Sequence, residues 1–178
     1  MFRQHHCAHF PRTKVRARTY LDSGHSFLEV KKKDNHGKTR KKRIAVPTIE
    51  AVINERYGED FLTERTGYTF SDIIPTIENA FHRITLVNEA KTERLTIDFG
   101  IRFINHETGE TGSADNLVVI ELKRDGRMHS PILALLRQLR IKPSGFSKYC
   151  IVSAITNDGL KINRFKKRLH RYEKIKGK

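Results

Sequence analysis

The chain has 178 residues, of which 37% are hydrophobic and 31% are charged, so we expect a single domain spanning residues 1–178 around a lean core. Lys and Arg number 35 against 20 Asp and Glu, and the resulting net charge of +15 favours polyanionic partners, among them nucleic acid, polyphosphate, acidic lipid and phosphorylated substrates. Cys7 and Cys150 form no C-x-x-C pair, no apolar run approaches the roughly 20 residues of a membrane span, and the N-terminus lacks the apolar segment of a signal peptide, so we predict a cytoplasmic protein.

The chain reads mainly as β-strands joined by short turns. From Lys14 to Tyr20, charged residues alternate with small or apolar ones, which is the two-residue period of a strand. The Asp34-Asn35-His36-Gly37 stretch predicts a hairpin turn, because Asn and Gly tolerate positive φ. In chain order, strands are predicted near Lys14–Tyr20, Ser26–Lys33, Thr39–Val46, Ala80–Val87, Glu93–Phe103, Leu117–Lys123 and Lys148–Ala154.

Helical patterns are fewer and lie between or after these strands. A short helix is predicted at Ile49–Tyr57, and Ser130 followed by Pro131 is typical of an N-cap and a first helical position. A C-terminal amphipathic helix is predicted from the spacing of Ile162, Phe165, Leu169 and Tyr172. The predicted fold class is therefore α+β, with a largely antiparallel sheet and a few covering helices.

Charged residues share strand faces in several of these segments, and the alternate positions are largely apolar. Residues two apart in a strand point the same way. The sets that share a face are Arg16 and Arg18; Glu29, Lys31 and Lys33; Lys41 and Arg43; Arg94, Thr96 and Asp98; and Glu121 and Lys123.

Two arrangements explain this alternation. An ordinary antiparallel sheet buries its apolar face and exposes its charged one. A closed or nearly closed barrel instead turns the apolar face outward under helices and lines a tunnel with charge. We favour the barrel, because the charged faces carry many cations with single carboxylates rather than Ser, Thr and Gln. A bound polyanion with a carboxylate-held divalent metal would relieve the repulsion among those cations.

At these residues the sequence resembles a known family, the VTC domain. This is the polyphosphate polymerase domain of vacuolar transporter chaperone proteins, within the triphosphate tunnel metalloenzyme superfamily, and the resemblance covers roughly residues 1–154. The segments that carry it fall in the family's order. They are 14–20 (KVRARTY), 27–31 (FLEVK), 41–43 (KKR), 81–83 (FHR), 94–98 (RLTID), 120–123 (IELK) and 147–149 (SKY).

The resemblance implies a CYTH-like antiparallel tunnel in which Mg²⁺ or Mn²⁺ and basic side chains hold ATP or another nucleoside triphosphate. It also implies a metal-dependent phosphotransferase, which passes the terminal phosphoryl group to a polyphosphate chain. Arginine forks suit phosphate oxygens, and a lysine offers a mobile point charge. The predicted catalytic residues are Arg16, Arg18 and Lys31; the predicted substrate-binding residues are Lys41, Arg43, Arg83, Arg94, Lys123 and Lys148; and the predicted metal ligands are Glu121 and Glu29.

The N-terminus departs from the family pattern. Members usually begin with an E-x-K strand and a Tyr-Phe-Asp-Thr strand, whereas residues 1–6 resemble the loop that follows them. We therefore expect a barrel that is incomplete at the N-terminus, reduced or absent turnover, and a possible homodimer formed through an exposed strand edge.

Three other functions stay open on sequence alone. A triphosphatase would use water rather than a phosphate chain as the nucleophile. A non-catalytic module would bind polyphosphate or other polyanions without turnover. A general nucleic-acid-binding module would use the basic surface, although no zinc-finger, RRM or KH signature predicts sequence-specific recognition.

Overall fold

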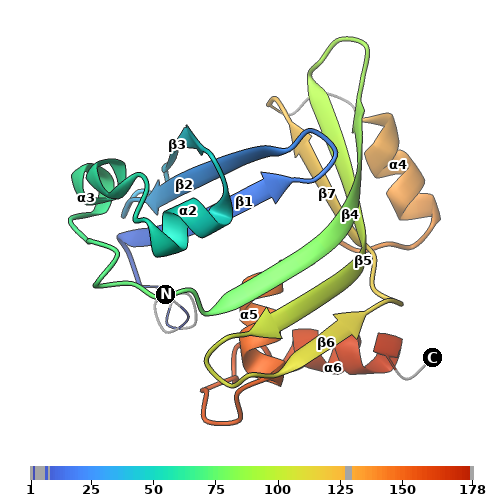
Figure 1. Cartoon of the computed structure of the whole chain (residues 1–178). Coiled ribbons are helices and arrows are strands. Elements are labelled where there is room, and N and C mark those ends of the chain that lie inside the picture. The colour runs from blue at the N-terminus through green and yellow to red at the C-terminus, as the bar shows by residue number, and fades with distance from the viewer. Residues whose placement is uncertain (1, 3–6, 8, 127–129, 177–178) are drawn as a thin grey trace. The chain divides into compact units, whose positions relative to one another are not determined.

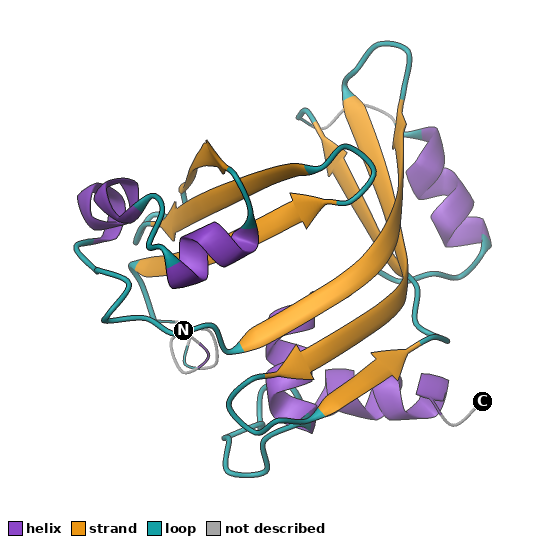
Figure 2. Ribbon diagram, in the orientation of Figure 1, coloured by secondary structure: helices purple, strands orange, loops and turns teal. Residues whose placement is uncertain are grey.

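The computed structural model describes residues 2, 7, 9–126 and 130–176, so most of the stretch matched to the N-terminal family loop lies outside the described residues. The chain divides into two compact units, Met1–Pro75 and Thr76–Lys178, and each is described by itself. Figures 1 and 2 show the strands and helices of both units. The assignment of the chain to a single domain stays a prediction.

The first unit is a three-stranded antiparallel sheet with two short helices. Its strands are β1 (Arg12–Tyr20), β2 (His25–Lys33) and β3 (Thr39–Val46), with β2 in the centre. The predicted hairpin turn joins β2 to β3: Asp34 N–H donates to Lys38 O at 3.0 Å, and Gly37 has φ +80. The three predicted strands of this region are thus confirmed to within two residues.

One face of this sheet forms the core of the unit. Leu28, Val46 and Val52 are buried there, and helices α2 (Ile49–Asn54) and α3 (Glu59–Thr66) supply the residues that pack on the strands. The Thr48 hydroxyl caps α2 by accepting from Ala51 N at 3.0 Å. This helix ends earlier than the predicted Tyr57, because Arg56 takes a left-handed φ of +57. Helix α3 was not predicted.

The second unit is built around one long strand. β5 (Glu93–Asn105) pairs antiparallel with β4 (Ile77–Val87), β6 (Thr111–Ala114) and β7 (Val119–Arg124). β6 was not predicted, whereas the other strands overlap their predicted ranges. Helices α4 (Pro131–Gln138), α5 (Lys148–Ile155) and α6 (Lys166–Lys176) follow.

A bulge divides the faces of β4 and β5. The pairing register shifts between Ala80 and His82, opposite Gly100, which has φ +58. Buried positions on β5 run through Thr96 and Asp98 and then change parity to Ile101, Phe103 and Asn105. The bulge adds one residue to β5, so the side chains that are buried before it are polar and those buried after it are mostly apolar. Of the apolar ones, Ile101 and Phe103 lie with Ile151 and Val152 of α5.

The predicted strand at Lys148–Ala154 is wrong, because this segment forms helix α5. The Ser147 hydroxyl accepts from Cys150 N at 3.4 Å and caps the helix. Residues Cys150 to Ala154 are all buried, so the run carries no polar face from which a helical period shows. The helix predicted after Ser130 is confirmed as α4, and the C-terminal helix is confirmed as α6, with Phe165, Leu169 and Tyr172 buried.

The fold is therefore α+β with antiparallel sheets, as predicted, but the described strands do not close into a barrel. They form two separate sheets, β1-β2-β3 and β4-β5-β6 with β7, and neither sheet closes on itself among the described residues. Among those residues, no helix is long and apolar enough to cross a membrane.

Candidate functional site

A buried carboxylate lies at the centre of the β1–β3 sheet, surrounded by cations. Glu29 is 2% exposed, and Arg16 Nε donates to its Oε2 at 3.0 Å. Lys41 Nζ lies 2.5 Å from Oε1, and Arg18 Nε lies 3.8 Å from Oε2. Burial raises the pKa of Glu29, but hydrogen bonds from Lys41 and Arg16 and the charges of Arg16 and Arg18 outweigh it, so the pKa lies below its ordinary value. Glu29 is therefore ionised near neutral pH.

The whole sheet face around Glu29 is cationic. The strand register places Lys14, Lys31 and Lys41 side by side in one row, and strands lie about 4.8 Å apart. Lys31 is exposed and makes no ion pair with a described residue. By register and alternation, the cations on this face are Arg12, Lys14, Arg16, Arg18, Lys31, Lys33, Lys41 and Arg43, and its one carboxylate is Glu29.

Aromatic rings of β1 and β2 orient the guanidinium groups of Arg18 and Arg43. Arg43 Cζ lies 4.3 Å from the ring centroid of Phe27, which packs edge-on against Tyr20 at 6.1 Å. Arg18 Nη1 donates to the Tyr20 hydroxyl at 2.6 Å. Burial raises the pKa of Tyr20, but the hydrogen bond and charge of Arg18 bring it below its ordinary value. The rings reduce the freedom that these arginines would lose on binding a ligand.

The second unit holds another buried carboxylate with cations. The Arg83 guanidinium forms a bidentate pair with Asp98, in which Nε donates to Oδ1 at 2.6 Å and Nη2 donates to Oδ2 at 2.7 Å. Lys148, the first residue of α5, pairs with Oδ2, and its ammonium lies 4.0 Å from the ring centroid of Phe81.

The pKa values in this pair follow from burial and charge. Burial raises the pKa of Asp98, but the hydrogen bonds from Arg83 and Lys148 outweigh it, so the net shift is downward. Burial also lowers the pKa of Lys148, and the partnership with Asp98 only partly offsets it. The contact between the two groups therefore lowers the pKa of Asp98 and opposes the fall that burial causes in the pKa of Lys148.

Farther along β5, the polar face is open and mixed in charge. Thr96 Oγ1 is buried with no hydrogen-bond partner among the described residues. Its register partner on β7 is Glu121, which is half exposed and lies 3.5 Å from Lys123 Nζ. Arg94 and Lys123 face each other in the next row of the same register.

The predicted metal ligands fit a divalent cation unequally. The described residues contain no cluster of three or more His, Cys, Asp or Glu side chains able to hold a metal. Both carboxylate oxygens of Glu29 contact cations, so the charge of this carboxylate is already balanced. A metal role for Glu29 therefore stays a prediction without geometric support. Glu121 is accessible, and Mg²⁺ commonly takes one or two carboxylates plus phosphate oxygens and waters.

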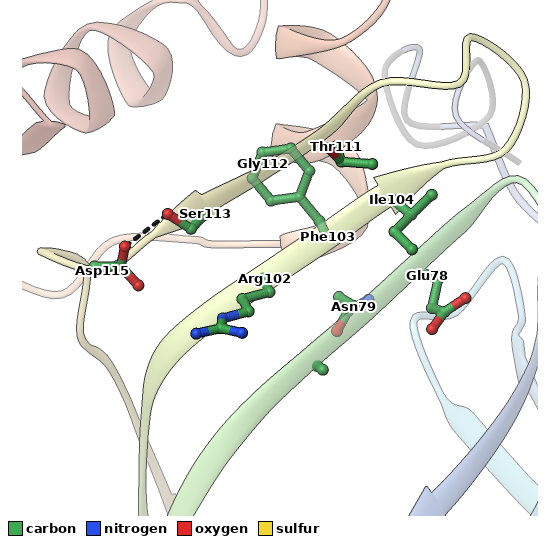
Figure 3. A pocket seen from close by; sticks show the side chains of 10 residues that line it. Glu78, Asn79, Arg102, Phe103, Ile104, Thr111, Gly112, Ser113 and Asp115 are labelled. Atoms are coloured by element: carbon green, nitrogen blue, oxygen red, sulfur yellow. Dashed lines mark hydrogen bonds between the residues drawn. The ribbon is translucent and has the colours of Figure 1, made fainter.

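A shallow groove of about 530 Å³ lies elsewhere in the second unit, along β4, β5 and β6 (Figure 3). The Ser113 hydroxyl donates to Asp115 Oδ2 at 2.6 Å along one side of it. Glu78, Asp115 and Arg102 all line it, so its charges are mixed, and none of the predicted site residues lines it. The groove therefore lacks the cation excess that a polyphosphate requires.

The structure brings some of the predicted site residues together and leaves others apart. Arg16, Arg18 and Lys41 meet at Glu29, and Arg83 and Lys148 meet at Asp98. The remaining predicted residues lie on the same sheet faces, and none of them forms an ion pair with Glu29 or Asp98. They are Lys31 and Arg43 on β2 and β3, and Arg94, Lys123 and Glu121 on β5 and β7.

Sequence reasoning did not place Asp98 or the aromatic rings in the site. Asp98 shared a predicted face with Arg94 and Thr96, and this alternation was the available signal. Tyr20, Phe27 and Phe81 fall within the segments that carry the family resemblance, but no role in the site was predicted for them, because an aromatic residue in a strand is most often part of the core.

Comparison with known protein families shows to which family the chain belongs. The family model described as VTC domain matches residues 1–157, which include all strands of both units and all of α5. The chain belongs to the VTC domain family. The resemblance found in the sequence is thereby confirmed. No curated protein and no solved structure matched the chain.

Membership in the VTC domain family supports a polyphosphate-related function. The match leaves the region of α6 outside its range and takes in both cation-capped carboxylates, Glu29 and Asp98. The two clusters are thus part of the region that defines this VTC domain.

Proposed function

We propose that this VTC domain binds the triphosphate of a nucleotide, and a polyphosphate chain, on the cationic face of β1–β3, as part of a triphosphate tunnel. The observation that supports the proposal is the charge of that face, where eight cations accompany the single carboxylate of Glu29. Crowded like charges destabilise a folded sheet, and a linear polyanion supplies the missing counter-charges.

Glu29 would position the cations rather than contact the ligand. Its buried carboxylate holds Arg16, Arg18 and Lys41 at one point of the face. A cation held by a fixed counter-ion is already ordered and keeps further N–H groups available to phosphate oxygens. The exposed side chains of Arg16 and Lys41 would bind phosphate at a low cost in conformational entropy.

The reaction that we propose is phosphoryl transfer to a growing chain. A terminal oxygen of the polyphosphate attacks the γ-phosphorus, the bond between that phosphorus and the β–γ bridging oxygen breaks, and a nucleoside diphosphate leaves. Such a transfer asks the protein mainly for in-line positioning and for neutralisation of charge on the transferred group. Arg16, Arg18 and Lys31 are the residues proposed to do this.

In the second unit, Arg83, Arg94, Lys123 and Lys148 are the proposed phosphate-binding residues. Arg94 and Lys123 are exposed and adjacent, whereas Arg83 and Lys148 are held by Asp98. Glu121 is the residue proposed to hold Mg²⁺ or Mn²⁺, which would neutralise phosphate charge.

A non-catalytic polyphosphate-binding module is the second candidate. The observation that favours it is the small number of carboxylates able to hold a catalytic metal on the described polar faces. Glu29 and Asp98 are both paired with cations, and only Glu121 is accessible. A triphosphatase is the enzymatic alternative and differs only in that water attacks.

Calorimetric titration of the full chain with ATP and with tripolyphosphate tests the binding step. Lys31→Ala should weaken both affinities, and Lys32→Ala is the matched control, because the neighbouring residue is also exposed but points to the opposite face of β2. Equal losses in the two variants would contradict a specific site on the Glu29 face.

Turnover is tested separately with ATP labelled at the γ-phosphate, Mg²⁺ or Mn²⁺, and a short polyphosphate primer. Labelled chains of increasing length support the polymerase, and free labelled phosphate supports the triphosphatase. Binding without either product supports the non-catalytic module.

A further inference from the structure

Helix α4 differs from the other helices of the second unit in the exposure of its apolar side chains. None of its residues is buried, whereas α5 buries most of its length. Leu135 is 49% exposed and Leu139 is 59% exposed, and residues four apart lie on the same side of a helix. The described part of the chain therefore leaves an apolar stripe of α4 largely open to solvent.

The end of α4 extends this apolar stripe. The N–H of Ile141 donates to Leu136 O at 2.8 Å, and Arg140 takes a left-handed φ of +55. This is a Schellman ending, which folds the chain back so that the apolar residue after the turn lies near the last helical turn. Ile141 is 45% exposed, so this end of the helix carries a third exposed apolar side chain beside those of Leu135 and Leu139 in the sequence.

The charged residues of the chain segment that contains α4 all have one sign. Residues 126–157 contain no Asp or Glu, and Arg137, Arg140 and Lys142 lie within or directly after the helix. None of the three makes an ion pair with a described residue. A helix with an apolar face and cationic flanks is complementary to the boundary between headgroups and acyl chains of an anionic bilayer.

We propose that α4 and the residues up to Lys142 form a docking surface for an anionic membrane. The helix would lie in the plane of the interface, with Leu135, Leu139 and Ile141 among the acyl chains and the cations against anionic headgroups. A helix of this length holds a domain at a surface reversibly, since it buries only a few apolar side chains. The inference does not depend on the proposed phosphoryl transfer.

Vesicle sedimentation with the full chain, without nucleotide, tests the docking surface. We expect the protein to sediment with vesicles of phosphatidylcholine mixed with phosphatidylglycerol, and much less with phosphatidylcholine alone. Leu135→Ser with Leu139→Ser should weaken that binding by at least about tenfold. Both side chains are about half exposed, so the domain should remain folded, which circular dichroism would show.

A second variant tests the charge without touching apolar side chains. Arg137→Gln with Arg140→Gln should weaken binding about twenty-fivefold, at roughly fivefold per cation near an anionic surface. The matched control is Lys32→Gln with Lys42→Gln, which removes the same charge from exposed positions of the first unit. Leu21→Ser, at a loop residue that is 87% exposed, is the apolar control.

Three results would overturn the proposal. The first is equal partitioning onto neutral and anionic vesicles. The second is a loss in the Lys32 and Lys42 control as large as that in the Arg137 and Arg140 variant, which would indicate attraction by overall charge. The third is a wild-type dimer in light scattering that Leu135→Ser with Leu139→Ser dissociates, since a second copy would then cover α4. Unchanged tripolyphosphate affinity in the α4 variants would separate this surface from the Glu29 face.

Discussion

The Glu29 cluster and the Asp98 cluster use the same elements in different proportions. Glu29 lies among three cations on an open sheet face with five more, and the side chains of Arg16 and Lys41 are 54% and 42% exposed. Asp98 has two close cations, and Lys148 is only 16% exposed. The Glu29 face thus has more positive charge than its one carboxylate can neutralise, whereas the charges of the Asp98 cluster nearly cancel one another.

This difference indicates that the Asp98 cluster serves mainly the stability of the fold and the Glu29 cluster mainly the binding of a ligand. A buried pair with no accessible partner resembles a structural salt bridge, which costs several kcal/mol to break from one side. An exposed cation can turn to water when it loses its counter-ion, so its pair contributes little to stability. We therefore expect Asp98 to stabilise the fold more than Glu29 does, and the Glu29 face to dominate binding of polyanions.

The largest expected effect comes from removing one carboxylate at a time. Asp98→Asn should lower the free energy of unfolding by about 4 kcal/mol, because it leaves Lys148 buried without its counter-charge. Glu29→Gln should cost about 1 kcal/mol, since Arg16 and Lys41 can reach solvent. Urea denaturation measures both values, with the exposed Asp22→Asn as control. Equal losses at the two carboxylates would break the comparison.

The next effect concerns ligand affinity. Arg16→Ala with Arg18→Ala should weaken tripolyphosphate binding about a hundredfold, at about 1.5 kcal/mol for each charge-assisted hydrogen bond lost. The matched control is Arg40→Ala with Lys42→Ala, which removes the same charge from the opposite face of β3. Calorimetry on both pairs decides the matter. If the control loses as much affinity, the attraction comes from net charge rather than from the Glu29 face.

A smaller effect is the stabilisation that a bound ligand confers. Tripolyphosphate at one hundred times its dissociation constant should raise the free energy of unfolding by about 2.7 kcal/mol. Addition of Mg²⁺ or Mn²⁺ should enlarge the shift if Glu121 holds a metal against the phosphates, and Glu121→Gln should remove only that increment. Thermal melts at matched ionic strength measure it. An equal shift with sulfate would indicate screening in place of binding.

The sequence predicted the strands of the first unit well, because one face of that sheet is apolar and the other charged. The alternation from Lys14 to Tyr20 defined both the strand and the residues that share its charged face. By contrast, the Cys150–Ala154 run is buried throughout and contains only one polar residue, Ser153, and a buried helix and a buried strand look alike in such a run. Without a polar face, the segment offered no period to measure.

The Asp98 cluster depended on information that no local pattern carries. Arg83 reaches Asp98 through the register of β4 on β5, and Lys148 reaches it from a helix fifty residues farther along the chain. The bulge at Gly100 then shifts the alternation of β5, so the buried residues change from even to odd positions after Asp98. The closure of a sheet likewise depends on distant strand pairs, so alternation alone could not decide whether these strands form a barrel.

The smallest effect is the dependence of stability on pH, which has the same sign in both clusters but extends to an additional alkaline range in the Asp98 cluster. Folding lowers the pKa of both Glu29 and Asp98, so each carboxylate contributes stability that is present above its unfolded pKa of about 4 and is lost as pH falls through the folded pKa. Folding also lowers the pKa of Lys148, so the unfolded chain binds more protons between that lowered value and about 10.4, and this lysine makes stability rise with pH there. Unfolding titrations on Asp98→Asn and Glu29→Gln would assign the acid limb: each should lose part of its steepness. An acid limb unchanged in both variants would mean that neither carboxylate is ion-paired in solution.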